Sequence, residues 1–215
     1  MGRSHVFAAA ALLVLGAGSS QGQVIRPERM MSTPFLWTSV SAGWVRMPRA
    51  VHDGPSNAWW NFGDGSQLRG SVEYPISRTT SLGGAFTTSN VGLVWSGTDC
   101  GNSANLCNAN ANIAQYLGVL HYGGTRTGFN EALDVEAGIT RFSDFQTDTG
   151  SSLGTGKPTT DFTFAVAYGF GYSVASWLQV TLQQEFLMMA HKKTAGAVGS
   201  TVQSQTTRIG VRVGL

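Results

Sequence analysis

The sequence predicts an all-β protein, an eight-stranded antiparallel, up-and-down β-barrel that crosses a membrane. Segments in which apolar and polar residues alternate with a period of two recur along the chain, whereas helix signals are nearly absent. The connections between these segments alternate between long and short without exception. Charged residues make up only 12% of the chain, against about 25% in soluble domains, and the lysines lie in predicted loops: Lys157, Lys192 and Lys193.

Residues 1–22 are predicted to form a cleaved secretory signal peptide. A short basic start precedes the apolar run 6–16, and small residues follow, with cleavage expected after Gly22 or, alternatively, after Gly18. A membrane anchor would need about 20 apolar residues in a helix, and this run is too short. We therefore expect an exported protein whose β-barrel domain covers residues 23–215.

The predicted strands are long enough to cross a bilayer, for which a tilted strand needs about 9–11 residues. They cover 35–47, 67–77, 81–95, 114–122, 131–144, 161–173, 177–189 and 205–215. Alternating long and short connections are typical of outer-membrane barrels, in which the periplasmic turns are short and the external loops are long. With an even number of strands, both termini are expected to face the periplasm.

One face of most predicted strands is bulky and aromatic, and the other is small or charged. In 161–173, aromatic residues alternate with threonine, alanine and glycine. The interior of an eight-stranded barrel is just wide enough for side chains to fill it, so we expect the aromatic face to meet lipid. The alternatives are a soluble lipocalin-like barrel with the opposite orientation and, for the charges, a solvated strand face. The charges expected to pair inside the barrel are Arg69, Glu73, Asp134, Glu136, Glu185, Arg208 and Arg212.

Aromatic residues near predicted strand ends suggest the girdles that flank a lipid-facing band, with ordinary packing as the alternative. They are Trp44, Tyr74, Trp95, Tyr116, Tyr122 and Trp177. The segment 59–65 is unusual for an external loop. Packing on the barrel rim is expected there, and the alternatives are binding of an apolar or sugar partner and an early start of the second strand.

Cys100 and Cys107 are the only cysteines of the chain. In an exported protein, such a close pair favours a disulfide within a surface loop. A metal site is the alternative, and it lacks further cysteine or histidine ligands nearby. Asp144, Asp148 and Asp161 match no calcium-loop spacing. We expect no metal and no cofactor.

The last strand carries the pattern of a polar residue, a glycine two positions later, and two hydrophobic positions separated by one residue. These are Arg208, Gly210, Val213 and Leu215. The pattern resembles the C-terminal assembly signal of outer-membrane β-barrels, although Leu215 stands where phenylalanine is most typical. The whole predicted domain resembles small eight-stranded barrels of the OmpX, OmpW and opacity-protein type. This resemblance implies insertion by the barrel-assembly machinery with periplasmic chaperones, and contact with outer-membrane lipids and lipopolysaccharide.

The resemblance implies a structural or surface-interaction role, in envelope integrity or adhesion, with a ligand at the long loops. The alternatives are a narrow porin-like passage for small or hydrophobic solutes and, less favoured, a lipid A-modifying enzyme. No histidine shows the spacing of a catalytic motif, so we expect no enzyme and no catalytic residues. The net charge of +2, without a basic stripe, argues against nucleic-acid binding.

Overall fold

The computed structural model describes residues 34–54, 56–101, 104–124, 127–154, 158–191 and 201–215. The predicted signal peptide and the three lysines lie outside these residues. Within them, no helix has the length and apolar character needed to cross a membrane. The one short helix among the described residues is the 3-10 turn η1 (Thr98–Cys100).

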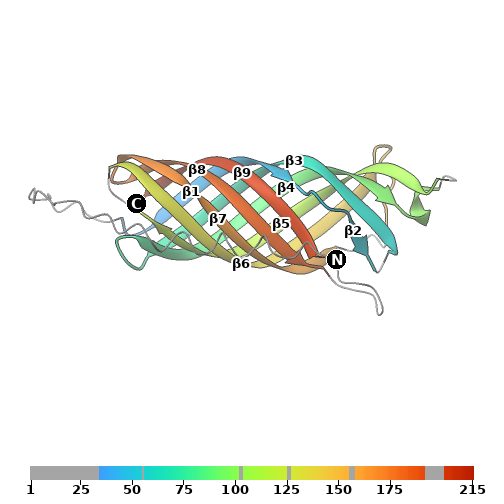
Figure 1. Cartoon of the computed structure of the whole chain (residues 1–215), viewed down its shortest axis with the longest axis horizontal. Helices are drawn as coiled ribbons and strands as arrows, with labels where there is room; N and C mark the ends of the chain where they lie inside the picture. The colour runs from blue at the N-terminus through green and yellow to red at the C-terminus, as the bar shows by residue number, and fades with distance from the viewer. Residues whose placement is uncertain (1–33, 55, 102–103, 125–126, 155–157, 192–200) are drawn as a thin grey trace, which may run out of the picture. The chain divides into compact units, whose positions relative to one another are not determined.

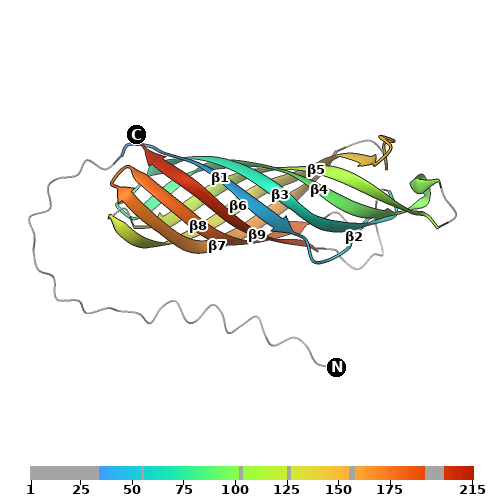
Figure 2. The same ribbon diagram turned by 90° about the horizontal axis from the view of Figure 1, so that it is seen from above.

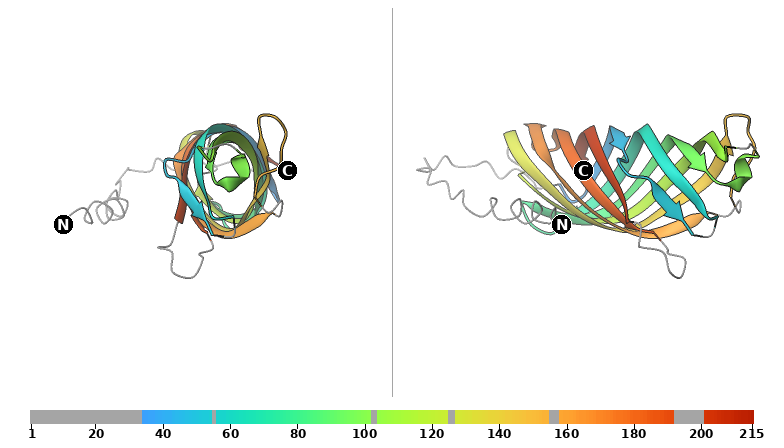
Figure 3. Two further views of the ribbon diagram at one scale, coloured as in Figure 1. Left: turned by 90° about the vertical axis from the view of Figure 1, so that its right-hand side faces the viewer. Right: turned by 45° about the vertical axis from the view of Figure 1, so that its right-hand side comes forward.

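The described chain forms a closed antiparallel barrel of eight long strands (Figures 1 and 2). The strands are β1 (Trp37–Arg46), β3 (Ala58–Pro75), β4 (Thr80–Ser96), β5 (Leu106–Gly123), β6 (Gly128–Thr147), β7 (Thr159–Ala175), β8 (Leu178–Ala190) and β9 (Thr201–Gly214). Each pairs with its neighbour in sequence, apart from a short additional strand, β2 (Val51–Asp53), which pairs only with β3. β1 pairs with both β3 and β9, and this pairing closes the ring seen end-on in Figure 3. The predicted fold class is confirmed.

Two strands begin eight or nine residues earlier than the sequence analysis predicted. β3 begins at Ala58, so the segment 59–65 is part of a strand, and the expectation that it packs on the rim as a loop was wrong. β5 begins at Leu106, because alternating asparagine and alanine continue the period of two. As a result, β3, β4, β5 and β6 have 17 to 20 residues, whereas β1 has 10. The longer strands form a taller wall at the end of the barrel opposite the C-terminus (Figure 1).

The aromatic face points outward along the part of the barrel nearer the C-terminus. On β7, Tyr172 is 57% exposed while its neighbour Ser173 is buried. A continuous apolar belt on the outside with small and charged residues inside is the arrangement of a barrel surrounded by lipid. The orientation expected from the sequence is therefore the observed one in this part of the molecule.

The orientation changes near the long loops, where large aromatic residues point inward. Trp95, predicted to belong to a girdle, is 1% exposed and lies in the lumen with Trp60. Tyr116 is exposed but lies within β5 and not near its end, because the strand begins earlier than predicted. Of the predicted girdle, the remaining residues are exposed on the outside: Trp44, Tyr74, Tyr122 and Trp177.

Candidate functional site

Charged side chains from facing strands meet inside the part of the barrel nearer the C-terminus. Arg69 of β3 makes a bidentate contact with Glu136 of β6, in which Nη1 lies 2.7 Å from Oε2 and Nη2 lies 2.9 Å from Oε1. Arg208 of β9 donates to Glu185, to Asp134 Oδ2 at 3.1 Å and to Glu136 Oε1 at 3.3 Å. These residues are all buried. Each carboxylate therefore has a guanidinium partner, the condition under which buried charge is tolerated.

The second ion pair lies closer to the barrel end that holds the C-terminus. Arg212 Nη2 donates to Glu73 Oε2 at 2.8 Å, and its guanidinium lies 4.2 Å from the centre of the Trp37 ring. Glu73 also accepts hydrogen bonds from Ser71 and Ser81. With this pair, the structure places all seven charges predicted for the interior inside the barrel. We call the seven residues the ionic layer.

A histidine for which the sequence analysis proposed no role contacts the ionic layer. His121 Nδ1 lies 2.6 Å from Asp134 Oδ1, and Gln183 Nε2 donates to the other carboxylate oxygen at 2.8 Å. A cavity of about 20 Å³ remains beside these groups. That volume holds about one water molecule. Among the described residues, the ionic layer and this small cavity occupy this part of the lumen.

Aromatic and aliphatic side chains fill the lumen toward the long loops. Trp60 stacks on Trp95 with ring centres 5.9 Å apart, and the Phe145 and Phe142 rings lie 4.6 and 5.8 Å from Trp60. The cluster extends over β1 to β9; we call it the aromatic layer, and its buried members include Phe62, Val91, Leu93, Ile113, Leu187, Met189 and Val202. The aromatic layer therefore fills a second section of the lumen, with apolar side chains in place of charged ones.

A buried polar trio joins the aromatic layer to the hairpin formed by β2 and β3. His191 Nδ1 lies 2.6 Å from Asp161 Oδ2, and His191 Nε2 lies 3.2 Å from Asp53 Oδ1. Ser56 donates to Asp53 from its backbone amide and its hydroxyl. The Trp60 ring, with its centre 5.1 Å from that of His191, covers the trio.

The trio contains charged side chains at the ends of the barrel strands near the long connections. Burial disfavours the charged imidazole, but the two carboxylates outweigh it and raise the pKa of His191 to about 9. Burial likewise opposes the charge of Asp53, whose pKa is lowered by His191 and Ser56. Sequence reasoning missed this site because its members come from three separate segments and share no spacing. The signal in the sequence that could have revealed the site is a histidine and an aspartate at the loop-side ends of adjacent strands.

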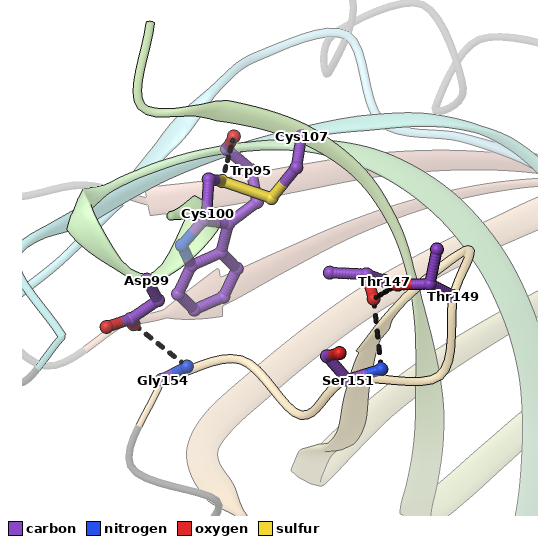
Figure 4. The surroundings of a disulfide bond; sticks show 8 residues. All are labelled: Trp95, Asp99, Cys100, Cys107, Thr147, Thr149, Ser151 and Gly154. Atoms are coloured by element: carbon purple, nitrogen blue, oxygen red, sulfur yellow. Dashed lines mark hydrogen bonds between the residues drawn. A yellow bond between two sulfur atoms is a disulfide. The ribbon is translucent and has the colours of Figure 1, made fainter. Parts of the chain in front are cut away.

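Two of the long connections are tied to one another (Figure 4). Cys100 and Cys107 form the predicted disulfide, with Cα atoms 5.6 Å apart, which links η1 to the start of β5. Asp99 Oδ2 accepts a hydrogen bond of 3.0 Å from the backbone amide of Gly154 in the β6–β7 loop. These links hold two long loops in one arrangement. Asp144, Asp148 and Asp161 do not come together, and the described residues contain no cluster of three potential metal ligands.

The residues of the predicted C-terminal signal lie where β9 closes the barrel. Arg208 and Gly210 point into the lumen, and Gly210 lies opposite Ser41 of β1. A Cβ atom at Gly210 would lie 2.6 Å from Ser41 Cβ, so glycine permits the close approach of the two strands. Val213 pairs with Thr38, and the Leu215 amide donates to the Leu36 carbonyl at 2.8 Å.

No protein-family profile matches the chain, and no curated protein sequence matches it. Solved structures do match it. Neisserial surface protein A has a TM-score of 0.53 at 16% identity, over 84% of this chain and 97% of the other. The outer membrane protein OprG from Pseudomonas aeruginosa has a TM-score of 0.53 at 10% identity, over 85% of this chain and 97% of the other. Together with the closed antiparallel sheet and its apolar outer belt, these matches give the chain the fold of the small eight-stranded outer-membrane β-barrels.

Proposed function

We propose that the protein is a closed outer-membrane barrel that acts at the cell surface through its loop end and does not conduct solutes. The observation that carries this proposal is the double closure of the lumen. The ionic layer leaves a cavity of about 20 Å³, and Trp60, Trp95, Phe142 and Phe145 fill the section beyond it. A passage for solutes would have to displace both layers at once.

The apolar belt supports the placement in a membrane, and the loop lengths support the orientation. The short turns and the C-terminus lie at one end of the barrel and the long connections at the other (Figure 1). In an outer-membrane barrel the end with short turns faces the periplasm, so we assign both termini to that side. We further propose that the barrel-assembly machinery reads Arg208, Gly210, Val213 and Leu215, that periplasmic chaperones deliver the chain, and that lipopolysaccharide surrounds the external half.

The loop end has the properties of a preorganised interaction surface. β2 extends the sheet beside β3, the disulfide Cys100–Cys107 closes the β4–β5 connection, and Asp99 holds the β6–β7 loop. A surface that is ordered before binding loses less conformational entropy on association. This supports a role in adhesion or envelope integrity.

Planar-bilayer recording of the refolded protein tests the closed lumen, with a known porin as the positive control. We expect no steady single-channel steps from the wild type. The variant Trp60→Ala, which opens only the aromatic layer, should also remain silent because the ionic layer still closes the lumen. Reproducible conductance steps from the wild type would contradict the proposal and favour a passage.

Fractionation tests the membrane placement separately. The full chain should be recovered with the outer membrane and should migrate differently on gels before and after boiling, as folded barrels do. A folded monomer that stays in detergent-free buffer would contradict the membrane assignment.

A further inference from the structure

The taller wall of the barrel carries a groove on its outer side that the closed lumen does not explain. The groove has a volume of about 360 Å³ and is lined by residues of β3, β4 and β5, and by one residue of the β6–β7 loop. Most of these residues face outward, and three of them are buried: Phe62, Leu93 and Ala109. Small-molecule sites typically begin at about 300 Å³. The lining residues that matter are Asn61, Gly63, Gly92, Asn108, Asn110 and Asp148.

Two glycines produce the hollow. The register of β3 and β4 shifts between Phe62 and Gly65, so that Gly63 and Gly92 lie at an irregularity of the ladder. A Cβ atom at Gly92 would come no closer than 3.8 Å to any other group, the nearest being Asn110 Oδ1. Space alone therefore does not require a glycine at this position. Because Gly92 has no side chain, the backbone of the sheet at this position is accessible to a ligand.

Amide side chains border the hollow on both sides. Asn61 and Asn108 flank Val94 in one cross-strand row. On the other side Asn90 Nδ2 donates to Asn112 Oδ1 at 2.8 Å, and Asn112 Nδ2 donates to Asp144 Oδ2 at 3.0 Å. These hydrogen bonds fix the orientation of the Asn90 and Asn112 side chains. An amide offers both a donor and an acceptor, which is the pairing that a hydroxyl group needs.

The charge of the groove excludes an anionic ligand. Asp148 is the charged residue among those lining it, and no lining residue is cationic. A carboxylate accepts hydrogen bonds from hydroxyl groups and repels phosphate. Two residues before Asn61, on the same face of β3, the Trp59 side chain is half exposed. An exposed ring two positions from Asn61 suits the apolar face of a sugar.

The position of the groove on the barrel wall indicates which molecule would supply the sugar. The groove opens sideways from the barrel wall and not from the loop tips. Toward the barrel end that holds the C-terminus, the outer faces of the same strands become apolar at Leu68, Phe86 and Tyr116. A ligand in the groove therefore lies just beyond the lipid-facing belt, at the level of the saccharides that surround an outer-membrane protein.

We propose that this groove binds a neutral sugar unit of the lipopolysaccharide core in the surrounding membrane. The inference rests on the proposed outer-membrane placement. The groove would hold the glycan layer against the taller wall through Asn61 and Asn108, with the sugar ring over Gly63 and Gly92.

The test is binding of a dephosphorylated, lipid-free core oligosaccharide to the refolded full barrel in detergent, measured by saturation-transfer NMR. Gly92→Leu fills the groove. Gly84→Leu is the matched control, because Gly84 lies on the outer face of the same strand with the same 3.8 Å clearance. We expect wild type and Gly84→Leu to bind equally and Gly92→Leu to bind at least tenfold more weakly. A double variant that combines Asn61→Ala with Asn108→Ala adds no volume to the groove. It should also weaken binding at least threefold.

Undiminished binding by Gly92→Leu, or no binding by the wild type, would overturn the proposal. A neutral host-type glycan, lacto-N-tetraose, distinguishes the source: if it binds and the core oligosaccharide does not, the membrane source is wrong. Gel mobility before boiling shows that each variant is folded, and the double asparagine variant stands in if Gly92→Leu does not fold. Failure of sugar binding with normal outer-membrane fractionation would overturn this inference alone and leave the proposed function standing.

Discussion

The two layers of the lumen fill the same cylinder with opposite chemistry. Along β4, Phe86 points outward and Thr87 inward, whereas farther along Asn90 points outward and Val91 inward. Polarity thus inverts between the two halves of one strand while the alternation of side chains continues. Where lipid covers the outside, the apolar residues are outside and the lumen takes the charges. Where the strands extend beyond the lipid belt, the outer face is polar and the hydrophobic effect drives the apolar residues into the lumen.

The two layers should therefore respond differently to substitution. The ionic layer depends on complete pairing, because a buried charge that loses its partner is destabilising. The aromatic layer depends on packing, because a truncated ring leaves a cavity that the surroundings fill only in part.

Loss of Arg208 should have the largest effect on stability. Arg208→Met leaves Asp134 without a guanidinium partner and Glu185 with only Arg69, at 3.8 Å, and the expected cost is about 5 kcal/mol, near the upper end for a broken buried pair. Urea unfolding of the refolded barrel, followed by tryptophan fluorescence, measures it. Adding Glu185→Gln should recover part of the loss, and an additive double variant would show that the two groups do not interact.

Truncation of Trp60 should have the next largest effect. Trp60→Ala removes the ring at the centre of the aromatic layer and is expected to cost about 3–4 kcal/mol. Its sequence neighbour Trp59 is the matched control, since Trp59 is 52% exposed and Trp60 is 1% exposed. We expect Trp59→Ala to cost less than about 1 kcal/mol. Equal losses would mean that the loop end is not packed as described.

The His191 trio should make stability depend on pH. The pKa of His191 is raised to about 9, so its contribution is complete below the unfolded value near 6.5 and is lost as pH rises through about 9. The lowered pKa of Asp53 has the opposite sign, and its contribution is lost as pH falls through the acid range. His191→Gln should cost about 1.5–3 kcal/mol at pH 6.

Unfolding midpoints of wild type and His191→Gln between pH 6 and pH 10 test this prediction. The difference between them should shrink as the wild-type imidazole loses its proton. A constant difference would show that His191 contributes only as a neutral hydrogen-bonding group.

The exposed pair Arg46–Asp64 should have the smallest effect. Their side chains are 65% and 39% exposed, and surface ion pairs contribute about 0–1 kcal/mol. Arg46→Ala should shift the urea midpoint slightly, and added salt should remove the shift. An effect as large as that of Arg208→Met would contradict the distinction between buried and exposed charge.

Much of the barrel could be predicted from local pattern. Alternation located all eight long strands, and the bulk of one face indicated the lipid side along β7. The interior positions of Arg69, Glu136 and Arg208 followed from the same alternation. Their partners did not, because ion pairs across the lumen join β3, β6 and β9 through a register that no single strand encodes.

The early starts of β3 and β5 and the inward turn of Trp95 were harder to predict. Tryptophan near a strand end is compatible with a girdle and with a packed lumen, and the distinction depends on how far the strand extends beyond the lipid. The groove at Gly63 and Gly92 depends in addition on a register shift between two strands.

The amino-acid sequence by itself determined the strand number, the antiparallel order and the face that meets lipid, because these follow from local periodicity and connection length. It also determined the disulfide, because the two cysteines lie close together in the chain. Only the tertiary structure decided which charges pair, where the lumen changes from ionic to aromatic, and how His191 joins Asp53 and Asp161. The physical reason is that closing a barrel brings together residues from distant strands. Those contacts depend on the relative registers of all eight strands, a property of the whole cylinder.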